Sequence, residues 1–533
     1  MAGTLSHLLR LARAGLVFAE HGVRFLPKGT PVPLALRAGR WAAALANGLT
    51  WPFRRSVKRR PGESRIAAAL SALGPSYIKA GQFLAARPDL VGKELAQDLK
   101  SLQDRMAPFP EGQARAAIRS GLGQPVETIF AKLGPPIAAA SIAQVHKATI
   151  QELDGSERAV AVKILRPDIE RRFAQDIGSF RYAAGQIERF SVEARRLKPL
   201  AVVDTLDRSM ELELDLRLEA AAISEMAENT KSDEGFRVPT VDWQRTARNV
   251  LTTEWIDGTP IADKAALEAA GFDLKALGET VIRSFLLHAM RDGFFHADMH
   301  QGNLFVDAQG RVVAVDFGIM GRLTPKERRF LAEILYGFIT RDYRRAAEAH
   351  FAAGYVPPHH SVEVFAQALR AIGEPLYGRP AEEISMGHLL GQLFAYTDVF
   401  DMETRPELIL LQKTMVVVEG VARHLDATVN IWTAAEPVVK AWLEKELGLE
   451  GRLAEARTGM GEIGAFLGAL PHLLTQAERA ASAFAAMGET GLRLDEETVR
   501  RLAAAQSRQT RSTRIAIWIG AVSLLLLLAA AVL

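Results

Sequence analysis

One short stretch of the chain, RDGFFHADMHQGNLFV at residues 291–306, limits the possible folds more than any other part of the sequence. Asn303 follows Asp298 by five residues, and a second aspartate stands thirteen residues further on, at the start of Asp316-Phe317-Gly318. Carboxylate and amide oxygens are the ligands that Mg²⁺ prefers, and a separate carboxylate beside a reacting group can act as a base. We therefore predict that Asn303 and Asp316 hold Mg²⁺ against a triphosphate, while Asp298 lies beside the phosphoryl acceptor as the proton acceptor.

The two histidines of this stretch allow other interpretations. His296, Asp298 and His300 stand at alternate positions, so they could form a His-x-Asp-x-His metal site on one face of a strand. That site would leave the adjoining Gly-Asn and the Asp-Phe-Gly unexplained. The two aspartates and Asn303 could also be plain loop-capping residues. We predict instead that His296 braces the Asp-Phe-Gly backbone and that His300 and Gly318 have structural roles.

A lysine suited to binding phosphates lies upstream. The segments SIAQVHKATI and RAVAVKIL flank Asp154-Gly155, a pair typical of hairpin turns, so Lys163 is predicted to lie on a strand. A lysine at this place pairs with the α- and β-phosphates when a carboxylate from a helix holds it, and ELELDLRLEAAA offers Glu213, Asp215 and Glu219. The motifs occur in the order in which protein kinases carry them. We therefore predict an α+β, protein-kinase-like fold of two lobes.

Two features depart from ordinary protein kinases. No G-x-G-x-x-G precedes Lys163; PIAAASIAQVHKA stands in its place, and its Cβ atoms restrict both positive φ and close backbone approach to phosphates. The second departure follows Gly318, because Thr324-Pro325-Lys326-Glu327 reads as an N-cap, an N1 proline and a capping box after only five intervening residues. A segment that holds a peptide does not fit into that gap, which argues against a conventional protein substrate.

The rest of the chain is predicted to be mainly helical. Apolar residues recur at helical spacing over 63–105, 168–230, 274–292 (ending at Gly293) and 324 to about 510. Residues 248–260 read as a strand that runs into a loop, and 304–318 as a hairpin that turns at Gln309-Gly310.

The C-terminus predicts a membrane anchor. Ile515–Leu533 is 19 residues without a charge, roughly 28 Å as a helix against a hydrocarbon core of ~30 Å. Arg508, Arg511 and Arg514 precede it and favour a cytoplasmic body; a buried core helix is the alternative. Near the other end, WPFRRSVKRR at 51–60 suits either an anionic membrane surface or a solvated linker.

Composition excludes several classes of site and partner. There is no cysteine, which rules out disulfides, thiolate metal sites and cysteine nucleophiles. A net charge of +3, from 65 basic and 62 acidic residues, gives no support for nucleic-acid binding.

From about residue 65 to 430 the chain resembles the UbiB family of atypical kinases, also called ABC1 or aarF-domain kinases. The resemblance rests on YIKAGQFLAARPDL, LQDRMAPFP, AAASIAQVH, ELDLRLEA, EWIDGTP, HADMHQGN and VDFG. The membrane tail is similar to that of family members, although these often have two C-terminal spans and only one is predicted here.

The resemblance implies a helical N-terminal extension that lies over the active site and blocks peptides. Its KxGQ motif, Lys79, Gly81 and Gln82, would regulate the site, with Glu213 or Asp215 as the ionic partner of Lys79 and Glu219 as the partner of Lys163. The implied ATP-binding residues are the loop Ile137, Ala138, Ala139, Ala140, Ser141, Ile142, Ala143, Gln144 and Val145, together with Lys163, Glu219, Glu254 and Ile256.

The predicted division of the chain follows from these segments. It consists of an amphipathic and basic membrane-proximal segment (1–62), the KxGQ helical extension (63–125), a kinase-like N-lobe with a helical insert (126–260), a C-lobe (261–435), a helical C-terminal region (436–512) and a transmembrane helix (513–533).

The resemblance implies an ATP- and Mg²⁺-dependent ATPase or phosphotransferase of ubiquinone biosynthesis at the bacterial inner membrane. It would make polyprenyl intermediates accessible for ring hydroxylation, with membrane lipids and polyprenyl quinone precursors as partners, other ubiquinone-biosynthesis proteins as further candidates, and no nucleic acid. Three alternatives remain open: a true kinase acting on a protein or small molecule, a direct 2-polyprenylphenol hydroxylase, and a nucleotide-sensing scaffold without turnover.

Overall fold

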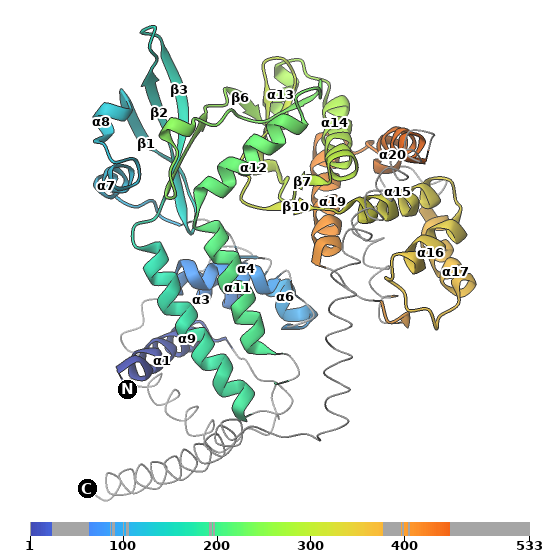
Figure 1. Ribbon diagram of the computed structural model, residues 1–533, viewed down its shortest axis with the longest axis horizontal. Coiled ribbons are helices and arrows are strands. Elements are labelled where there is room, and N and C mark those ends of the chain that lie inside the picture. The colour runs from blue at the N-terminus through green and yellow to red at the C-terminus, as the bar shows by residue number, and fades with distance from the viewer. Residues whose placement is uncertain are drawn as a thin grey trace, which may run out of the picture. The chain divides into compact units, whose positions relative to one another are not determined.

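The computed structural model (Figure 1) describes residues 2–23, 63–85, 91–99, 106–190, 198–376 and 406–447, the stretch 399–402 and the isolated positions 87, 101, 102, 195 and 396. This part of the chain combines helices and sheets, as predicted. The basic-aromatic segment at 51–60 and the predicted membrane span at 513–533 lie outside the described residues. Among the helices that are described, none is both long enough and apolar enough to cross a membrane.

A four-stranded sheet in the order β1-β2-β3-β5 forms the small lobe. Its strands are β1 (Lys132–Ala139), β2 (Ala143–Gln151), β3 (Glu157–Leu165) and β5 (Val250–Glu254), all paired antiparallel. The predicted hairpin joins β2 to β3, and Gly155 adopts φ +83° in its turn, a conformation that glycine takes without steric penalty.

The two faces of β3 have different neighbours. Val160, Val162 and Ile164 are fully buried in one hydrophobic cluster with α7 (Glu111–Leu122) and α8 (Val126–Ile129). Because side chains alternate along a strand, Lys163 lies on the opposite face. The helix α7 therefore packs on the small-lobe sheet, and the boundary predicted at residue 125 differs from the packing, which groups residues from about 109 onward with the sheet.

A second group of helices forms a separate N-terminal core. It contains α1 (Ala2–Glu20), α3 (Arg65–Leu73), α4 (Pro75–Ala85) and α6 (Lys93–Leu99). It contacts the helical insert, which comprises α9 (Ile169–Phe190), α11 (Pro199–Glu213) and α12 (Leu216–Asn229). The contact on α1 includes an ion pair of 3.0 Å between Arg10 Nη1 and Asp176 Oδ1, and Tyr77 of α4 packs edge-on against Phe180.

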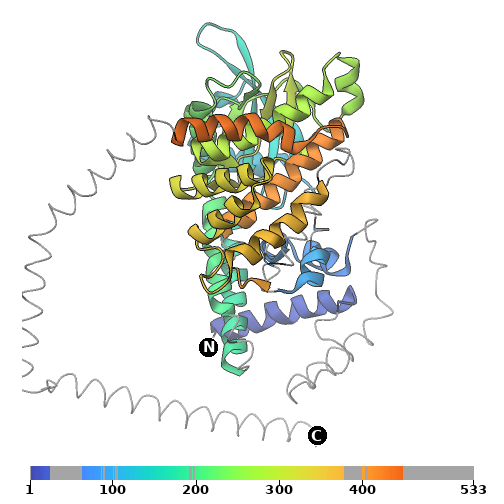
Figure 2. The same cartoon turned by 90° about the vertical axis from the view of Figure 1, so that its right-hand side faces the viewer.

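The large lobe is built from helices that stack one above another in Figure 2. They are α13 (Lys264–Ala269), α14 (Leu274–Leu287), α15 (Pro325–Ile339), α16 (Tyr343–Ala352), α17 (Val362–Gly373), α19 (Pro406–Leu425) and α20 (Ile431–Leu447). The capping box predicted at Thr324 is present at the start of α15. The helix predicted to run to residue 292 ends as α-helix at Leu287, and a π-turn over 288–292 precedes Gly293.

Short strands, most of which were not predicted from the sequence, position the loops around Asp298 and Asp316. One sheet has the order β4-β9-β8-β6, from β4 (Phe236–Arg237), β9 (Val312–Ala314), β8 (Leu304–Asp307) and β6 (Gly258–Pro260). A second pairs β10 (Met320–Arg322) with β7 (Phe294–His296). Strands of two to four residues are too short to show an alternating pattern, whereas the hairpin of β8 and β9 was predicted.

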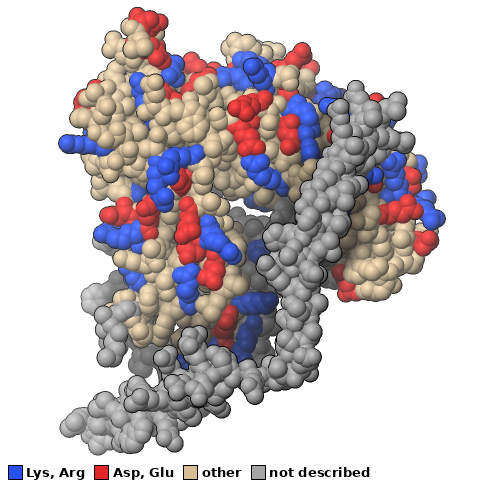
Figure 3. Space-filling model, in the orientation of Figure 1, with Lys and Arg blue, Asp and Glu red and all other residues tan. Residues whose placement is uncertain are grey.

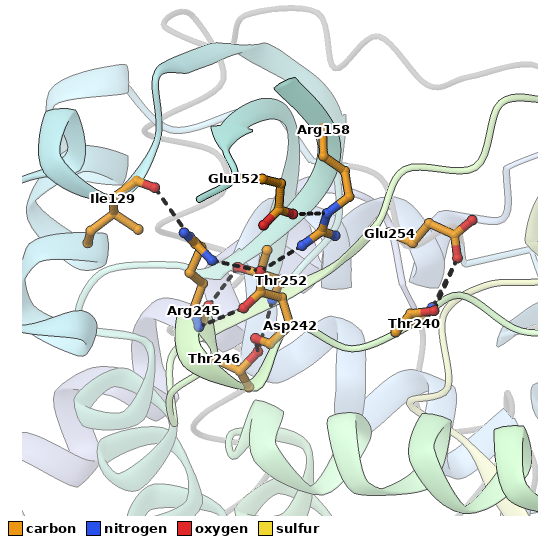
Figure 4. Close-up of polar contacts among 9 residues, drawn as sticks. All are labelled: Ile129, Glu152, Arg158, Thr240, Asp242, Arg245, Thr246, Thr252 and Glu254. Carbon is orange, nitrogen blue, oxygen red and sulfur yellow. Dashed lines mark hydrogen bonds and ion pairs between the residues drawn. The ribbon is translucent and has the colours of Figure 1, made fainter. Parts of the chain in front are cut away.

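The surface carries charges of both signs. On the face in Figure 3, basic and acidic side chains are interspersed, and several of them form pairs along single helices, such as Arg283 with Glu279 at 2.6 Å and Arg344 with Glu348 at 3.0 Å. Figure 4 shows a more buried network in the small lobe, in which Asp242 receives hydrogen bonds from Arg158 at 3.2 Å and from Arg245 at 3.0 Å. This network joins β3 to the loop ahead of β5.

Candidate active site

The centre of the site is one lysine between two carboxylates. Lys163 Nζ, on β3, donates to both oxygens of Glu219 at 2.8 and 2.9 Å and to Oδ1 of Asp316 at 2.9 Å. Glu219 comes from α12, and Asp316 from the loop after β9. The structure thus joins three residues 56 and 153 positions apart in the sequence, and it is Glu219, among the three acidic candidates, that pairs with Lys163.

The three charged side chains of this site differ in burial, and they shift one another's pKa values. The side chains of Lys163 and Glu219 are 18% and 8% exposed, whereas that of Asp316 is 52% exposed. Burial alone would lower the pKa of Lys163, but the carboxylates of Asp316 and Glu219 outweigh it and raise that pKa. The Lys163 ammonium in turn holds the pKa of Asp316 below its ordinary value. One positive charge thus faces two negative ones, and the excess negative charge lies on the exposed carboxylate.

Asp316 occupies a strained backbone conformation. Its φ is +64°, in the left-handed region that residues other than glycine enter rarely and that clusters at functional sites. The next residue, Phe317, is buried and packs against the ring of His296 with the centroids 4.9 Å apart. The buried Phe317 keeps the exposed Asp316 side chain directed away from the core.

Both ring nitrogens of His296 form hydrogen bonds with the protein backbone. The Asp298 N–H donates to Nδ1 at 3.0 Å, so the ring proton belongs on Nε2, which lies 3.4 Å from the Val315 carbonyl. Burial lowers the pKa of His296, which favours the neutral ring. These contacts leave no nitrogen for a metal, and the His-x-Asp-x-His metal interpretation therefore does not fit the structure.

The loop that carries Asp298 is held at several points. Asn303 Nδ2 donates to the Asp298 carbonyl at 3.1 Å, and the Val315 N–H donates to the Asn303 carbonyl at 2.8 Å. His300 accepts the Gly302 N–H on Nδ1 at 3.0 Å and turns Nε2 toward Asp298 Oδ2, 3.6 Å away. Because Asn303 uses its amide nitrogen in the loop, its amide oxygen is the atom that could face a cation. Asn303 and the exposed Asp316 together provide the hard oxygen donors that suit Mg²⁺.

The segment predicted as a phosphate-covering loop is mostly strand. Ile137–Ala139 belong to β1 and Ala143–Val145 to β2, so the turn between them is only Ala140–Ile142. The prediction of a loop over 137–145 was wrong because it overlooked β1, whose prolines at 135 and 136 lower its strand signal. Within the turn, Ser141 is buried.

The same turn is held from outside by the segment that follows the N-terminal helices. The Met106 N–H donates to the Ala139 carbonyl at 3.2 Å, and Arg166 donates to the carbonyls of Ala140, at 2.8 Å, and Ala107, at 2.9 Å. The buried Gln144 side chain accepts from the Phe109 N–H at 2.9 Å. Gln144 therefore anchors this segment, and its side chain is not directed to a ligand.

Two of the implied ATP-binding residues, Glu254 and Ile256, lie where β5 leaves the small lobe. Glu254 ends β5, and its carboxylate accepts from Arg237 at 3.0 Å and from the Thr240 N–H at 3.2 Å (Figure 4 shows the contact with Thr240). The side chain is therefore occupied within the protein. Ile256 follows in the connection between β5 and β6.

The KxGQ residues lie on α4. Lys79 Nζ pairs with Glu213 Oε2 at 2.6 Å, and the charge of Lys79 also contributes to the lowered pKa of Asp316. Asp215, the alternative partner, instead forms the N-cap of α12 and binds Arg217. Gly81 is buried where α4 meets Leu70 of α3 and Leu102, and Gln82 is half-buried on the same helix.

Sequence reasoning missed Thr414, a fully buried residue of α19. Its Oγ1 lies 3.1 Å from the Ala297 carbonyl and 2.8 Å from the Leu410 carbonyl of its own helix. Ala297 directly precedes Asp298, so α19 contacts the loop that carries Asp298. A polar residue among apolar ones in LILLQKTMVVVEG was the available signal, but its partner lies 117 residues away.

The connection between the Asp-Phe-Gly and α15, on the side of the site where an acceptor would bind, is short. The Asp-Phe-Gly leads into β10 at Met320, and α15 begins at Pro325. The backbone between them is paired with β7. This leaves no extended segment there for holding a peptide.

Comparisons with known proteins agree with this geometry. A family model described as the ABC1 atypical kinase-like domain matches residues 101–350, and one described as the UbiB helical domain matches 369–430. The chain is 41% identical over 454 residues to the probable protein kinase UbiB of Marinobacter nauticus, covering 84% of this chain and 81% of that one. It is 38% identical over 475 residues to the probable protein kinase UbiB of Xanthomonas campestris pv. campestris, covering 88% and 84%.

A solved structure shares the fold. Rv3197 from Mycobacterium tuberculosis, solved as a complex with erythromycin, superposes with a TM-score of 0.51 at 24% identity, over 75% of this chain and 98% of that one. Together these matches confirm the predicted kinase-like fold.

Proposed function

The chain belongs to the UbiB family of ABC1 atypical kinase-like proteins, and we propose that it binds MgATP at the Lys163–Asp316 site and turns it over in ubiquinone biosynthesis. The observation that carries the proposal is the contact of Lys163 with both Glu219 and Asp316. A buried lysine held by a helix carboxylate beside an Asp-Phe-Gly aspartate is the arrangement that kinase-like enzymes use for the phosphates of ATP.

Each residue has a distinct task in this proposal. Mg²⁺, when bound with ATP, would neutralise charge on the β- and γ-phosphates. Asp316 and Asn303 would hold that ion, and Lys163, kept in place by Glu219, would orient the α- and β-phosphates. Asp298, whose backbone is fixed by His296 and Asn303, would hold the proton of the attacking hydroxyl or water. Positioning and electrostatics would then lower the barrier.

Hydrolysis to ADP and phosphate is the favoured reaction. The short connection between the Asp-Phe-Gly and α15 leaves little room for a peptide. The charge of Lys79 on α4, which pairs with Glu213, also helps to lower the pKa of Asp316. A true kinase is the second candidate, favoured by the name probable protein kinase that the relatives carry. Hydroxylation of the polyprenylphenol ring has no dinucleotide or flavin motif in the sequence to support it.

The proposed setting is the bacterial inner membrane. The tail at 513–533 would anchor the chain with its body in the cytoplasm, and turnover of ATP would move or expose polyprenyl intermediates to the enzymes that hydroxylate the ring. Membrane lipids and polyprenyl quinone precursors would be its partners, and other ubiquinone-biosynthesis proteins are further candidates.

The experiment incubates purified protein with γ-labelled MgATP and quinone-deficient membranes. Asp298→Asn and Asp316→Asn are the test variants. Asp342→Asn is the matched control, because Asp342 is the N-cap of α16 and asparagine caps a helix equally well. Label that appears only as free phosphate and is lost in Asp316→Asn would support the ATPase.

The other outcomes assign the alternatives. Label in a protein or lipid band would identify a kinase and its acceptor. Saturable ATP binding without turnover, unchanged in Asp298→Asn, would identify a nucleotide-sensing scaffold. Equal turnover in wild type and Asp316→Asn would contradict the proposed site.

A further inference from the structure

A second group of possible metal ligands lies in the large lobe, on elements that do not carry the Lys163 site. His359 and His360 stand in the loop between α16 and α17, and Asp401 lies 41 residues after His360, shortly before α19. His360 Nε2 is 3.2 Å and His359 Nε2 is 3.5 Å from the same oxygen, Oδ2 of Asp401. One potential ligand atom from each of the three residues lies within 4.8 Å of those from the other two.

The local backbone directs these side chains to one point. Pro357 and Pro358 directly precede the two histidines, and the His360 backbone N–H donates to the Pro357 carbonyl at 3.2 Å. Its ring packs edge-on against Phe400, with the centroids 5.4 Å apart, and Phe400 is itself buried. Asp401 has φ +46°, a left-handed conformation that aspartate adopts more often than most residues other than glycine.

We propose that His359, His360 and Asp401 bind a Zn²⁺ ion, with the fourth position open to water or to a ligand from outside. Zinc sits about 2.0–2.1 Å from such nitrogens and oxygens, so the edges of its tetrahedron are roughly 3.3 Å. The two nitrogen–oxygen distances of 3.2 and 3.5 Å are close to that edge. Two imidazoles and one carboxylate favour zinc over Mg²⁺ or Ca²⁺, which select oxygen ligands.

The ion would cross-link two segments that are distant in the sequence. It would join the α16–α17 loop to the residues ahead of α19, the helix whose Thr414 contacts the catalytic loop. His359 and Asp401 have side chains 64% and 66% exposed, so the ion can enter from solvent, and substitutions at these two positions leave the core intact.

The test uses the full chain with a histidine-free affinity tag, stripped of metal and titrated with zinc against a chromophoric chelator. We expect one zinc per chain, bound about tenfold or more weakly in His359→Ala and in Asp401→Asn, with Mg²⁺ unable to compete. Zinc should also raise the melting temperature of the wild type but not of these variants. His424→Ala is the control, because His424 is an exposed histidine that contacts only the Ala262 carbonyl in the described contacts.

Cobalt gives an independent measurement. Co²⁺ in the same site should show the intense visible absorption of a tetrahedral ion in wild type and His424→Ala, and lose it in Asp401→Asn. A wild type that retains no zinc, or ligand variants that bind it as tightly as the wild type, would overturn the proposal. These readouts need no ATP, so they are independent of the proposed function.

Discussion

At the residue scale, the site depends on a charge balance around Lys163. Its ammonium is the shared partner of two carboxylates from different elements. The loss of a partner from a buried pair leaves an uncompensated charge, which is more damaging than replacing both members together.

Lys163→Met is therefore expected to destabilise the protein by about 3 kcal/mol, because Glu219 would stay buried without a cation. The double variant Lys163→Met with Glu219→Gln should recover part of that loss. Urea unfolding of the two single variants and the double variant measures the coupling. Additive effects of the two substitutions would mean that the pair contributes nothing of its own.

A second residue-scale prediction concerns pH. Burial alone would raise the pKa of Asp233, but hydrogen bonds from His288 and Arg291 outweigh it and lower the pKa to about 2. A carboxylate with a lowered folded-state pKa stabilises the protein above its unfolded-state pKa and loses that contribution as the pH falls toward the folded value. Asp233→Asn should thus cost about 2 kcal/mol at pH 7.

The gap in stability between wild type and Asp233→Asn should narrow as the pH falls from about 4 toward 2. Denaturant unfolding at a series of pH values measures it. A gap that stays constant over this range would indicate a packing effect with no contribution from the charge.

At the element scale, α19 contacts the loop that carries Asp298 through one hydroxyl, that of Thr414. Thr414→Val keeps the shape of the side chain but removes the donor to the Ala297 carbonyl. We expect a several-fold lower kcat for ATP turnover with a nearly unchanged KM for ATP, and rescue by Thr414→Ser. Thr230→Val is the matched control, because Thr230 is buried and donates only within its own helix in the described contacts.

Hydrogen exchange of residues 297–303 gives a readout for Thr414 that does not require turnover. Thr414→Val should speed exchange in this loop, and Thr230→Val should not. Equal exchange in the two variants would show that α19 does not hold the loop.

The packing of α4 supports a second element-scale prediction. A Cβ on Gly81 would lie 2.7 Å from Leu70 Cδ1 and from Leu102 Cδ2, whereas one on Gly420 in α19 would have nothing within 4 Å. Gly81→Ala should therefore lose about 1 kcal/mol in unfolding free energy through overpacking. Gly420→Ala should gain about 0.5–1 kcal/mol from helix propensity. Changes of the same sign, measured by denaturant unfolding, would contradict this packing.

At the scale of the whole molecule, the described residues up to Leu443 form one compact unit. Arg237 of β4 joins the two lobes, because it donates to Glu254 at the end of β5 and to the buried Asp307 of β8, both at 3.0 Å. Residues of both lobes also share one hydrophobic core, which contains Ile142 and Leu165 of the small lobe and Val281 of α14. A nucleotide bound between the lobes would therefore stabilise both.

MgATP at 100 times its Kd is expected to add ~2.7 kcal/mol to the unfolding free energy and to raise the melting temperature measured by calorimetry. ATP with excess chelator should give much less, and Asp316→Asn should abolish the effect of the metal. Asp342→Asn should respond as the wild type does. Equal stabilisation with and without Mg²⁺ would exclude Asp316 as its ligand.

Features that depend only on neighbouring residues could be predicted from the amino-acid sequence. Asp154-Gly155 specifies a hairpin because the turn needs a positive φ, and Thr324 to Glu327 specify a helix start because their side chains satisfy its free N–H groups. The order of Lys163, Asp298, Asn303 and Asp316 along the chain was enough to predict the kinase-like fold.

Tertiary structure alone decided the features that join distant residues. The local pattern leaves Glu213, Asp215 and Glu219 as equivalent candidates. The family resemblance implied Glu219 for Lys163 but left Glu213 and Asp215 open for Lys79, and only the packing of α12 and α4 assigns Glu213 to Lys79 and Asp215 to a helix N-cap. Gln144 and Thr414 give no local sign of their partners, which lie 35 and 117 residues away. A local sequence pattern predicts on which face of a helix or strand a side chain lies. The partner of that side chain depends on how the elements pack, which is a property of the whole chain.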